Sequence, residues 1–220
     1  MKKIKIVGVG SGGNNAVNHM LESNIKNVDF IAVNGCKYSL KNSRTDNRIS
    51  LIPDFMRVIG QISLERRAEE ARERYEEIAK AINGADIVFI IAGMGGEVGT
   101  GASPVIAQIA KNLGILTVSI VTMPFFVERK RRAMRAKEGI DELKNFTDAL
   151  FAINLDVFLS EQPKIEIWDM QNDSATPIVV TISEKPNPSI ADAFKRADNA
   201  MCFCVQCLIS RYTNLDEKPI

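Results

Sequence analysis

The sequence has few of the residues that build metal sites and disulfide frameworks. It contains one histidine, His19, and four cysteines: Cys36, Cys202, Cys204 and Cys207. A structural zinc site needs four ligands, and no second group of Cys or His stands near the C-terminal cysteines to complete one. We therefore expect no metal held by protein ligands. We also expect the cysteines to be reduced, and the last three to be small apolar residues of a helix.

An excess of charge and long hydrophobic runs are also missing. The 28 Lys and Arg nearly balance 27 Asp and Glu, so the composition gives no sign of a partner such as duplex DNA or an acidic membrane. The apolar run after the basic start ends at Gly8, too short for a signal peptide, and no run approaches membrane-spanning length. We expect a cytoplasmic protein that binds no nucleic acid and does not insert into a membrane, with residues 1–220 forming one domain.

The sequence is rich in glycine at two places, each directly after an apolar run. Five glycines fall within the nine residues from Gly93 to Gly101, and a second group runs from Gly8 to Gly13. A strand, a glycine loop and a helix start in that order bring backbone amides and the positive end of the helix dipole close to an anion. Both places therefore predict phosphate binding, although the carboxylate of Glu97 is unfavourable beside a phosphate.

Apolar runs alternate with amphipathic segments along most of the chain. Strands are expected at residues 4–9, 28–33, 86–92, 115–121 and 149–153, and helices from residue 14, at 63–82, after 104, at 128–146 and at about 189–212. This alternation predicts an α/β fold, a Rossmann-like and mostly parallel sheet with helices on both faces. Residues 36–62 look irregular, and residues 160–188 form an irregular insertion in which 178–182 is one strand of a hairpin.

Other interpretations of these motifs were weighed. The first glycine group matches the dinucleotide fingerprint, but a NAD site also needs an acid at the end of the second strand, where Asn34 stands. No Walker sequence follows either loop, so a polyphosphate held from two sides is favoured over NAD and over simple tight turns. The basic residues 129–132 begin a helix and are either solvated or face an anion. The alternating Glu and Arg of residues 65–77 indicate a solvated helix face.

With these motifs the sequence resembles the FtsZ family of the tubulin and FtsZ GTPase superfamily. Residues 95–101 are similar to the family's glycine signature, residues 8–18 to its first phosphate loop and residues 122–128 to its ribose-side loop. Residues 192–198 resemble the start of its central helix, and residues 214–216 the loop that follows that helix. The resemblance covers most of residues 4–159 and 189–216 and implies the family's fold.

The resemblance implies a guanine nucleotide, GTP or GDP, bound with Mg²⁺. Phe194 would pack on guanine, and the carboxylate of Asp198 would accept hydrogen bonds from guanine N1 and N2, which adenine does not offer together. Asn214 and Asp216 would be the catalytic positions, reaching the nucleotide of the next subunit in a filament. The implied nucleotide-binding residues are Gly10, Ser11, Gly12, Gly13, Asn14, Asn34, Gly95, Gly96, Glu97, Val98, Gly99, Thr100, Gly101, Pro124, Glu128, Arg132, Phe194 and Asp198.

Several positions depart from the family's pattern. Glu97 and Val98 replace a glycine and a threonine, Gly35-Cys36 replace Thr-Asp, and Pro219 stands where the second catalytic acid would be. The glycine-rich third loop and the C-terminal domain of the family are missing from the sequence. A carboxylate about 4 Å from a phosphate is unfavourable by roughly 1 to 4 kcal/mol unless a cation lies between them. Both nucleotide affinity and hydrolysis are therefore expected to suffer.

The sequence leaves two possible functions. The first is an FtsZ-like GTP-binding protein of the bacterial division cytoskeleton, located in the cytoplasm at the division site. It would hydrolyse GTP weakly, or only in a head-to-tail assembly with itself or with a full-length FtsZ. The second is a non-enzymatic pseudo-GTPase that associates with or regulates FtsZ filaments. The choice depends most on the environment of Glu97.

Overall fold

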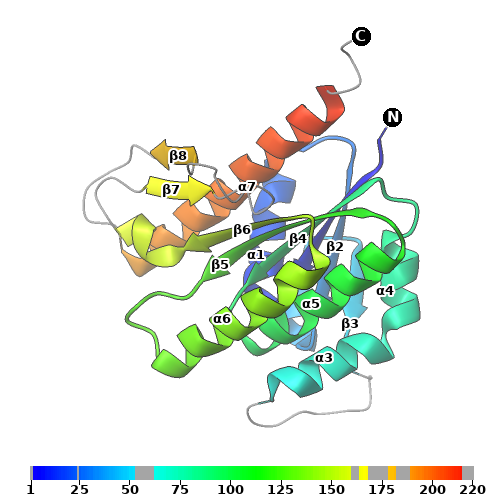
Figure 1. The fold of residues 1–220 in the computed structure, drawn as a ribbon, viewed down its shortest axis with the longest axis horizontal. Helices are drawn as coiled ribbons and strands as arrows, with labels where there is room; N and C mark the ends of the chain where they lie inside the picture. Colours follow the sequence, from blue (N-terminus) through cyan, green and yellow to red (C-terminus); the bar gives the residue numbers. More distant parts are fainter. Residues whose placement is uncertain are drawn as a thin grey trace.

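The computed structural model describes residues 2–23, 25–52, 62–159, 164–167, 178–181 and 189–214. Its centre is a six-stranded sheet in which every pairing is parallel, with the strand order β3-β2-β1-β4-β5-β6 (Figure 1). The strands are β1 Ile4–Val9, β2 Val28–Asn34, β3 Asn47–Ser50, β4 Ile87–Gly93, β5 Leu116–Met123 and β6 Ala149–Asn154. A separate pair, β7 Lys164–Ile167 and β8 Ile178–Thr181, is antiparallel, as the hairpin prediction required.

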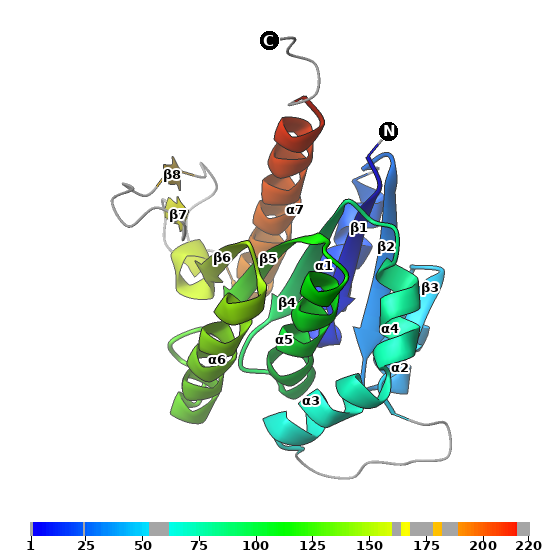
Figure 2. The same ribbon diagram turned by 45° about the vertical axis from the view of Figure 1, so that its right-hand side comes forward.

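Helices cover both faces of the sheet, so the expected fold class is confirmed (Figures 1 and 2). Alternate residues of β1 enter different cores, with Val7 and Val9 on one side and Ile4 and Ile6 on the other. The first core is closed by α3 Leu64–Glu73, α4 Tyr75–Ile82, α5 Glu97–Asn112 and α6 Lys130–Leu143. The second is closed by α1 Gly10–Glu22 and α7 Ile190–Asn214. Shorter elements are α2 Lys37–Lys41, η1 Lys144–Phe146 and η2 Leu155–Leu159.

The structure corrects several element boundaries. Helix α1 begins at Gly10 rather than at residue 14, and α5 begins at Glu97, so that Pro104 lies inside a helix rather than at the end of a loop. The helix expected at 63–82 is divided at Arg74 into α3 and α4. No proline or glycine marks that bend. Helix α3 packs on α5, whereas α4 contacts both α5 and β3, so tertiary packing sets the change of direction.

The strand order places both glycine groups at one point of the sheet. From β1 the chain builds outward through β2 and β3, then returns to the other side of β1 with β4 and continues through β5 and β6. Strands β1 and β4 are hydrogen-bonded neighbours, with Val9 paired to Ala92 at their carboxyl ends. The order of the strands reverses between them, and open α/β sheets bind ligands in the crevice at such a switch point. Within the described part of the chain, no helix has both the length and the apolar character needed to cross a bilayer.

Candidate functional site

The two glycine groups are in direct contact with each other. A Cβ on Gly10 would lie 2.9 Å from the amide nitrogen of Gly99, and one on Gly12 would lie 3.4 Å from Cα of Gly93. Gly99 itself packs so closely on the carbonyl of Gly93 that a side chain there would collide with it. The loop after β1 and the start of α5 therefore pack backbone against backbone, and side chains on these glycines would force them apart. We call this surface of backbone atoms the glycine cradle.

The turn after β4 is stabilised by the first turn of α5. Gly95 has φ = +87°, a conformation that favours glycine, and its N–H donates to Oγ1 of Thr100 at 2.7 Å. Thr100 is 1% exposed, and Oγ of Ser103 donates to the Gly99 carbonyl at 2.6 Å. The backbone amides of the loop are thus positioned by buried hydroxyl groups of the same helix. This places Thr100 at the predicted loop, where its hydroxyl contacts backbone.

Two buried asparagines connect the first glycine loop to β2. With the Asn14 amide oriented to suit its neighbours, its nitrogen donates to the Gly8 carbonyl at 2.8 Å and its oxygen accepts from Asn34 Nδ2 at 3.2 Å. Asn34 Oδ1 in turn accepts from the Cys36 amide at 3.0 Å. Ser11 is exposed, and its Oγ lies 3.2 Å from Oγ of Ser39. The asparagines hold the ends of β1 and β2 in place beside the cradle.

The loop between β5 and α6 forms the next part of the site. Glu128 Oε1 accepts from the Phe125 amide at 2.9 Å, and Oε2 pairs with Nη1 of Arg132 at 2.9 Å. The Arg132 side chain packs over Gly95, where a Cβ would lie 2.6 Å from its Cγ. Pro124 is buried in the same loop. Arg132 thereby touches the glycine turn and the ribose-side loop together, although its side chain, like that of Arg129 at the start of the same basic run, is exposed.

Phe194 and Asp198 both lie on α7, one helical turn apart. The Phe194 ring meets the Phe125 ring edge to face with 5.2 Å between centroids, and it remains 48% exposed. Burial raises the pKa of Asp198 to about 6, while the charge of His19 on α1 acts in the opposite direction. An exposed aromatic ring beside a carboxylate of raised pKa is typical of a binding site rather than of a stabilising surface pair.

On the other side of the cradle, Glu97 is bound to α3. Its Oε1 accepts from the Ile62 amide at 3.1 Å, and its Oε2 lies 3.6 Å from Nη2 of Arg67. Arg67 also donates from Nη1 to Glu70 Oε2 at 2.7 Å, and both of these side chains are buried. The prediction of a fully solvated Glu and Arg face is therefore wrong for Arg67 and Glu70, although pairs such as Arg72 with Glu69 are exposed.

Sequence reasoning did not identify Arg67. It falls in a run where arginine and glutamate alternate, and the alternation favours a solvated helix. A weak signal was available, since Arg67 stands four residues before Ala71 and so shares its apolar face. A cation beside Glu97 changes the expectation for that residue, because its charge is balanced by an arginine.

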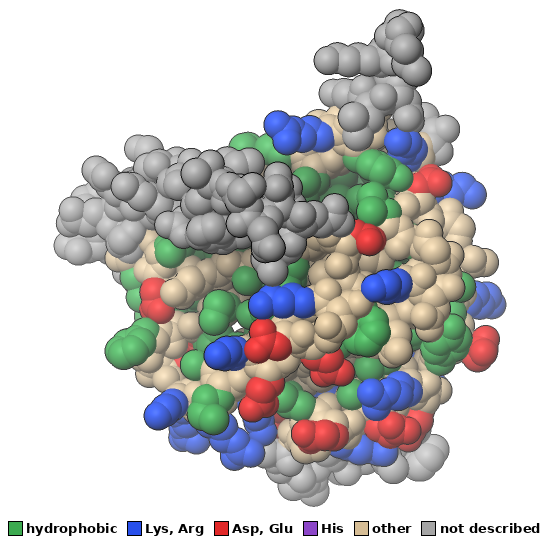
Figure 3. Space-filling view, viewed as in Figure 1, with side chains coloured by type: hydrophobic (Ala, Val, Ile, Leu, Met, Phe, Trp, Pro, Cys, Tyr) green, Lys and Arg blue, Asp and Glu red, His purple; other side chains and the backbone are tan. Residues whose placement is uncertain are grey.

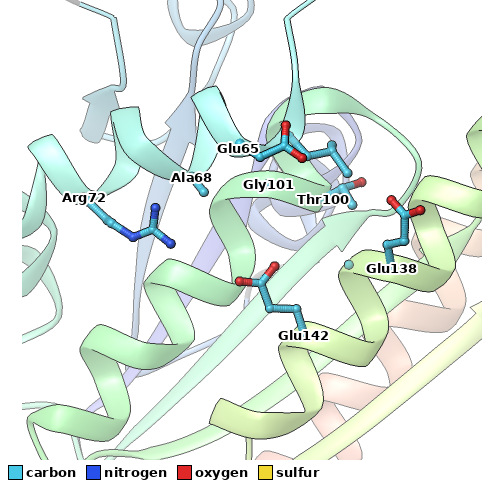
Figure 4. Close-up of a pocket in the computed structure, with 9 residues that line it drawn as sticks. Glu65, Ala68, Arg72, Thr100, Gly101, Glu138 and Glu142 are labelled. Atoms are coloured by element: carbon cyan, nitrogen blue, oxygen red, sulfur yellow. The ribbon is translucent and has the colours of Figure 1, made fainter.

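A hollow of about 210 Å³ lies between α3, α5 and α6 (Figure 4). The side chains of Glu65, Glu138 and Glu142 line it, with Arg72 at one side and Thr100 on the helix below. Three carboxylates against one guanidinium make this hollow unfavourable for a phosphate. The face drawn in Figure 3, on which α3, α5 and α6 lie as in Figure 1, carries interspersed acidic and basic side chains.

The remaining predicted residues are outside this geometry. Asp216 lies outside the described residues, and Asn214 is described only as the last residue of α7. Cys202 and Cys204 are buried on α7, as predicted for small apolar residues, whereas Cys207 is exposed. In the described ranges, no three His, Cys, Asp or Glu side chains are grouped closely enough to hold a metal ion.

Comparison with known proteins now identifies the family. The model of the Tubulin/FtsZ family GTPase domain matches residues 3–160. The chain belongs to the tubulin/FtsZ GTPase family. An FtsZ dimer structure from M. jannaschii is 31% identical, with a TM-score of 0.76 over 95% of this chain and 55% of that one. A W319Y mutant of M. jannaschii FtsZ is 32% identical, with a TM-score of 0.77 over 94% of this chain and 56% of that one.

A more distant solved structure shares the fold. CetZ2 from Haloferax volcanii is 20% identical, with a TM-score of 0.73 over 94% of this chain and 58% of that one. The chain thus spans little more than half the length of these structures. Guanine nucleotide binding belongs to this GTPase family, and the packed glycine cradle of this chain fits phosphates approached through backbone amides.

Proposed function

We propose that this FtsZ-like protein binds GTP and GDP at the carboxyl edge of the sheet, with the phosphates on the glycine cradle and the base on α7. The observation that carries the proposal is the pairing of an exposed Phe194 ring with the Asp198 carboxylate beside the loop of Phe125. The ring offers a stacking surface, and the ionised carboxylate offers two acceptors for N1–H and N2–H of guanine. The same edge of adenine lacks this pair of donors, so GTP is preferred over ATP.

The predicted phosphate-binding residues are assigned to two sides of the triphosphate. Gly10, Ser11, Gly12, Gly13 and Asn14 cover one side, with Asn34 behind them; Gly95, Gly96, Glu97, Val98, Gly99, Thr100 and Gly101 cover the other. Pro124, Glu128 and Arg132 lie towards the ribose. The support is that both glycine groups contact each other at the switch point and that Arg132 touches Gly95. Substitution of each of these residues, followed by measurement of GTP affinity, tests its proposed role.

We further propose that hydrolysis is weak or occurs only in a head-to-tail assembly. Asn214 and Asp216 would act on the nucleotide of a neighbouring copy or of a full-length FtsZ, where Asp216 orients the attacking water. Because Pro219 stands in place of a second acid, a single carboxylate polarises the water, and the rate of GTP hydrolysis is low. The 31% identical relative is an FtsZ dimer, which supports self-association. A cytoplasmic role in cell division and septation is the corresponding cellular proposal.

A second function is favoured by one observation, the acid at the phosphate loop. Glu97 lies in the first turn of α5, where a nucleotide phosphate would accept from the same helix start. If Glu97 always occupies that position, the chain is a pseudo-GTPase that joins or regulates FtsZ filaments without turnover. The two functions differ in two measurable properties, the affinity for GTP and the release of phosphate.

Isothermal titration of the full chain with GTP in the presence of Mg²⁺ tests the proposal. Saturable binding of GTP, with ATP at least tenfold weaker, is the expected result. Heat extraction of the purified protein for bound GDP or GTP is the complementary measurement. An absence of binding at millimolar GTP, together with an empty extract, would reject GTP binding and leave the pseudo-GTPase.

Phosphate release then separates the enzymatic part from the binding part. The chain is assayed alone, over a range of its own concentration, and mixed with a complete FtsZ. Turnover that rises with chain concentration supports hydrolysis at a contact between copies. Binding of GTP without phosphate release in any mixture would support the GTP site and reject GTPase activity.

A further inference from the structure

The buried guanidinium of Arg67 is incompletely satisfied. Nη1 donates to Glu70 at 2.7 Å, whereas Nη2 approaches Glu97 only to 3.6 Å, longer than a hydrogen bond. Nε is buried and has no hydrogen-bond partner among the described residues. Arg67 is 6% exposed, so solvent does not supply the missing acceptors. Buried arginine donors left without acceptors are costly, and they point to an anion that the site is built to receive.

Arg67 faces the phosphate cradle. A side chain on Gly35, at the carboxyl end of β2, would collide with Nη1, so the glycine there makes room for the guanidinium. The same position would lie 3.3 Å from Cγ2 of Val98, and a Cβ on Gly10 would lie 3.4 Å from Cβ of Val98. Arg67, Val98 and the two glycines thus form a continuous surface from α3 to the first phosphate loop. The start of α5, with its free amides, is on this surface.

We propose that Arg67 binds the terminal phosphate of a nucleoside triphosphate, and that Glu97 competes with that phosphate for the same guanidinium. This inference rests on the proposed GTP site and deepens it. A guanidinium is a planar donor that matches phosphate with two parallel hydrogen bonds. Glu70 remains on Nη1 and holds the side chain in place, while Nη2 and Nε are the donors for the phosphate. Glu97, with a side chain 26% exposed, turns towards solvent when phosphate arrives.

The contact of Arg67 with a terminal phosphate makes the site selective for triphosphate over diphosphate, and competition from Glu97 reduces that selectivity. A terminal phosphate compensates the protein for the loss of the Glu97 pair, and GDP, which lacks that group, leaves the pair intact. The loose 3.6 Å approach of Glu97 keeps this exchange small in free energy. Arg67 and Glu97 are therefore specificity-determining residues with opposite effects. Removing the first weakens GTP binding, and neutralising the second strengthens it.

The test is calorimetric measurement of Kd for GTP and for GDP with the full chain and four variants. Arg67→Gln should weaken GTP by on the order of tenfold to a hundredfold, the range for hydrogen bonds to a charged group, with GDP changed less than about threefold. Arg67→Lys keeps the charge but not the planar fork, so its Kd for GTP should lie between those of the unaltered chain and Arg67→Gln. Glu97→Gln should tighten GTP by roughly threefold to tenfold and leave GDP unchanged. Arg72→Gln is the matched control, because Arg72 lies on the same helix in an exposed pair with Glu69, outside the group of Arg67, Glu70 and Glu97, and should move neither Kd.

The outcomes separate the inference from the proposed function. If the unaltered chain binds neither nucleotide, both fail. If it binds GTP while Arg67→Gln weakens GTP and GDP equally, or neither, Arg67 is only structural and the inference alone fails. Should Arg67→Gln not fold, as judged by its thermal melt, Glu97→Gln and Arg67→Lys decide: an unchanged ratio of the two Kd values in both overturns the inference.

Discussion

The proposed guanine side and the proposed phosphate side of the site are built in different ways. At α7, Phe194 and Asp198 lie on one helix and meet the β5–α6 loop through a single ring contact. At α5, backbone atoms of two loops pack against each other, and Arg67, Glu70 and Glu97 form a charged group beside them. The guanine side keeps an exposed ring and a carboxylate of raised pKa, whereas the phosphate side is closely packed.

The sequence resemblance to the family also differs between the two sides. Residues 192–198 resemble the start of the family's central helix. The phosphate side departs from the family at Gly35, Glu97 and Val98, and all three departures contact one another or Arg67. They are thus parts of one rearrangement. Loss of a side chain at Gly35 admits the guanidinium, and the guanidinium balances the added carboxylate.

Replacing Asp198 should have the largest effect on GTP binding, and it tests whether this carboxylate recognises guanine. Asp198→Asn removes one of two acceptors and places a donor against N2–H of guanine, so GTP binding should weaken by about a hundredfold or more. The nucleotide XTP carries an oxygen at that position and should bind the variant better than GTP does. Titration of both nucleotides into both proteins measures the exchange. Equal loss of GTP and XTP binding would mean that Asp198 does not read the base.

Replacing Asp198 should increase the stability of the fold, although it weakens GTP binding. The pKa of Asp198 in the folded protein, about 6, lies above its ordinary 3.8, so the fold is most stable with the proton bound and loses that contribution as pH rises through 6. Asp198→Asn imitates the protonated form. At pH 7.5 its free energy of unfolding should rise by up to about 3 kcal/mol. Denaturant unfolding checks this, and a destabilised variant would show that the carboxylate is structural.

Thr100→Val tests the phosphate side and should cost less. The change is close to isosteric, but it leaves the buried N–H of Gly95 without its 2.7 Å acceptor. We expect a loss of about 1 to 3 kcal/mol in unfolding free energy, and weaker binding of GTP and GDP alike because the glycine turn is no longer held. Ser103→Ala, which removes a donor to the Gly99 carbonyl, is the matched control for lost hydroxyls. Unchanged stability in Thr100→Val would show that another group satisfies Gly95.

The sequence predicts the fold well because its signal is repeated. Buried strands such as Ile87–Gly93 are continuous apolar runs, and a parallel sheet follows from their alternation with helices. The parts it did not predict are those decided by tertiary contact. Arg74 divides a helix without proline or glycine, and β3 pairs through only four residues. Arg67 is polar in a polar helix, and its burial depends on the absence of a side chain at Gly35, far away in the sequence.

Lowering the pH should weaken GTP binding by a smaller factor than Asp198→Asn does, and it tests whether the ionised carboxylate binds guanine. As pH falls through about 6, Asp198 takes up a proton in the nucleotide-free protein and loses an acceptor. Between pH 7.5 and 5.0 the affinity should fall by about tenfold. Binding of GTP to Asp198→Asn is the control, because the phosphates titrate there too but the carboxylate is gone. Parallel profiles for the two complexes would assign the pH dependence to the phosphates.

The smallest expected effect is a change in the reactivity of Cys36, which reports on the phosphate side without altering it. Cys36 is exposed at the end of β2, and its pKa is lowered by hydrogen bonds from the backbone and hydroxyl of Ser39, with a contribution from the charge of Arg67. Burial raises the pKa of the Cys204 thiol to about 11, so that thiol should be inert in the native state.

Iodoacetamide should therefore modify Cys36 before the other three thiols, as followed by peptide mass spectrometry. GTP bound on the cradle should slow the reaction at Cys36 several-fold through steric cover, while the exposed Cys207 on α7 reacts at an unchanged rate. Arg67→Lys keeps the charge near the thiol and should preserve the reactivity, whereas Arg67→Gln should reduce it. Equal protection of Cys36 and Cys207 by GTP would indicate a global change rather than a nucleotide beside β2, because only Cys36 borders the proposed phosphate site.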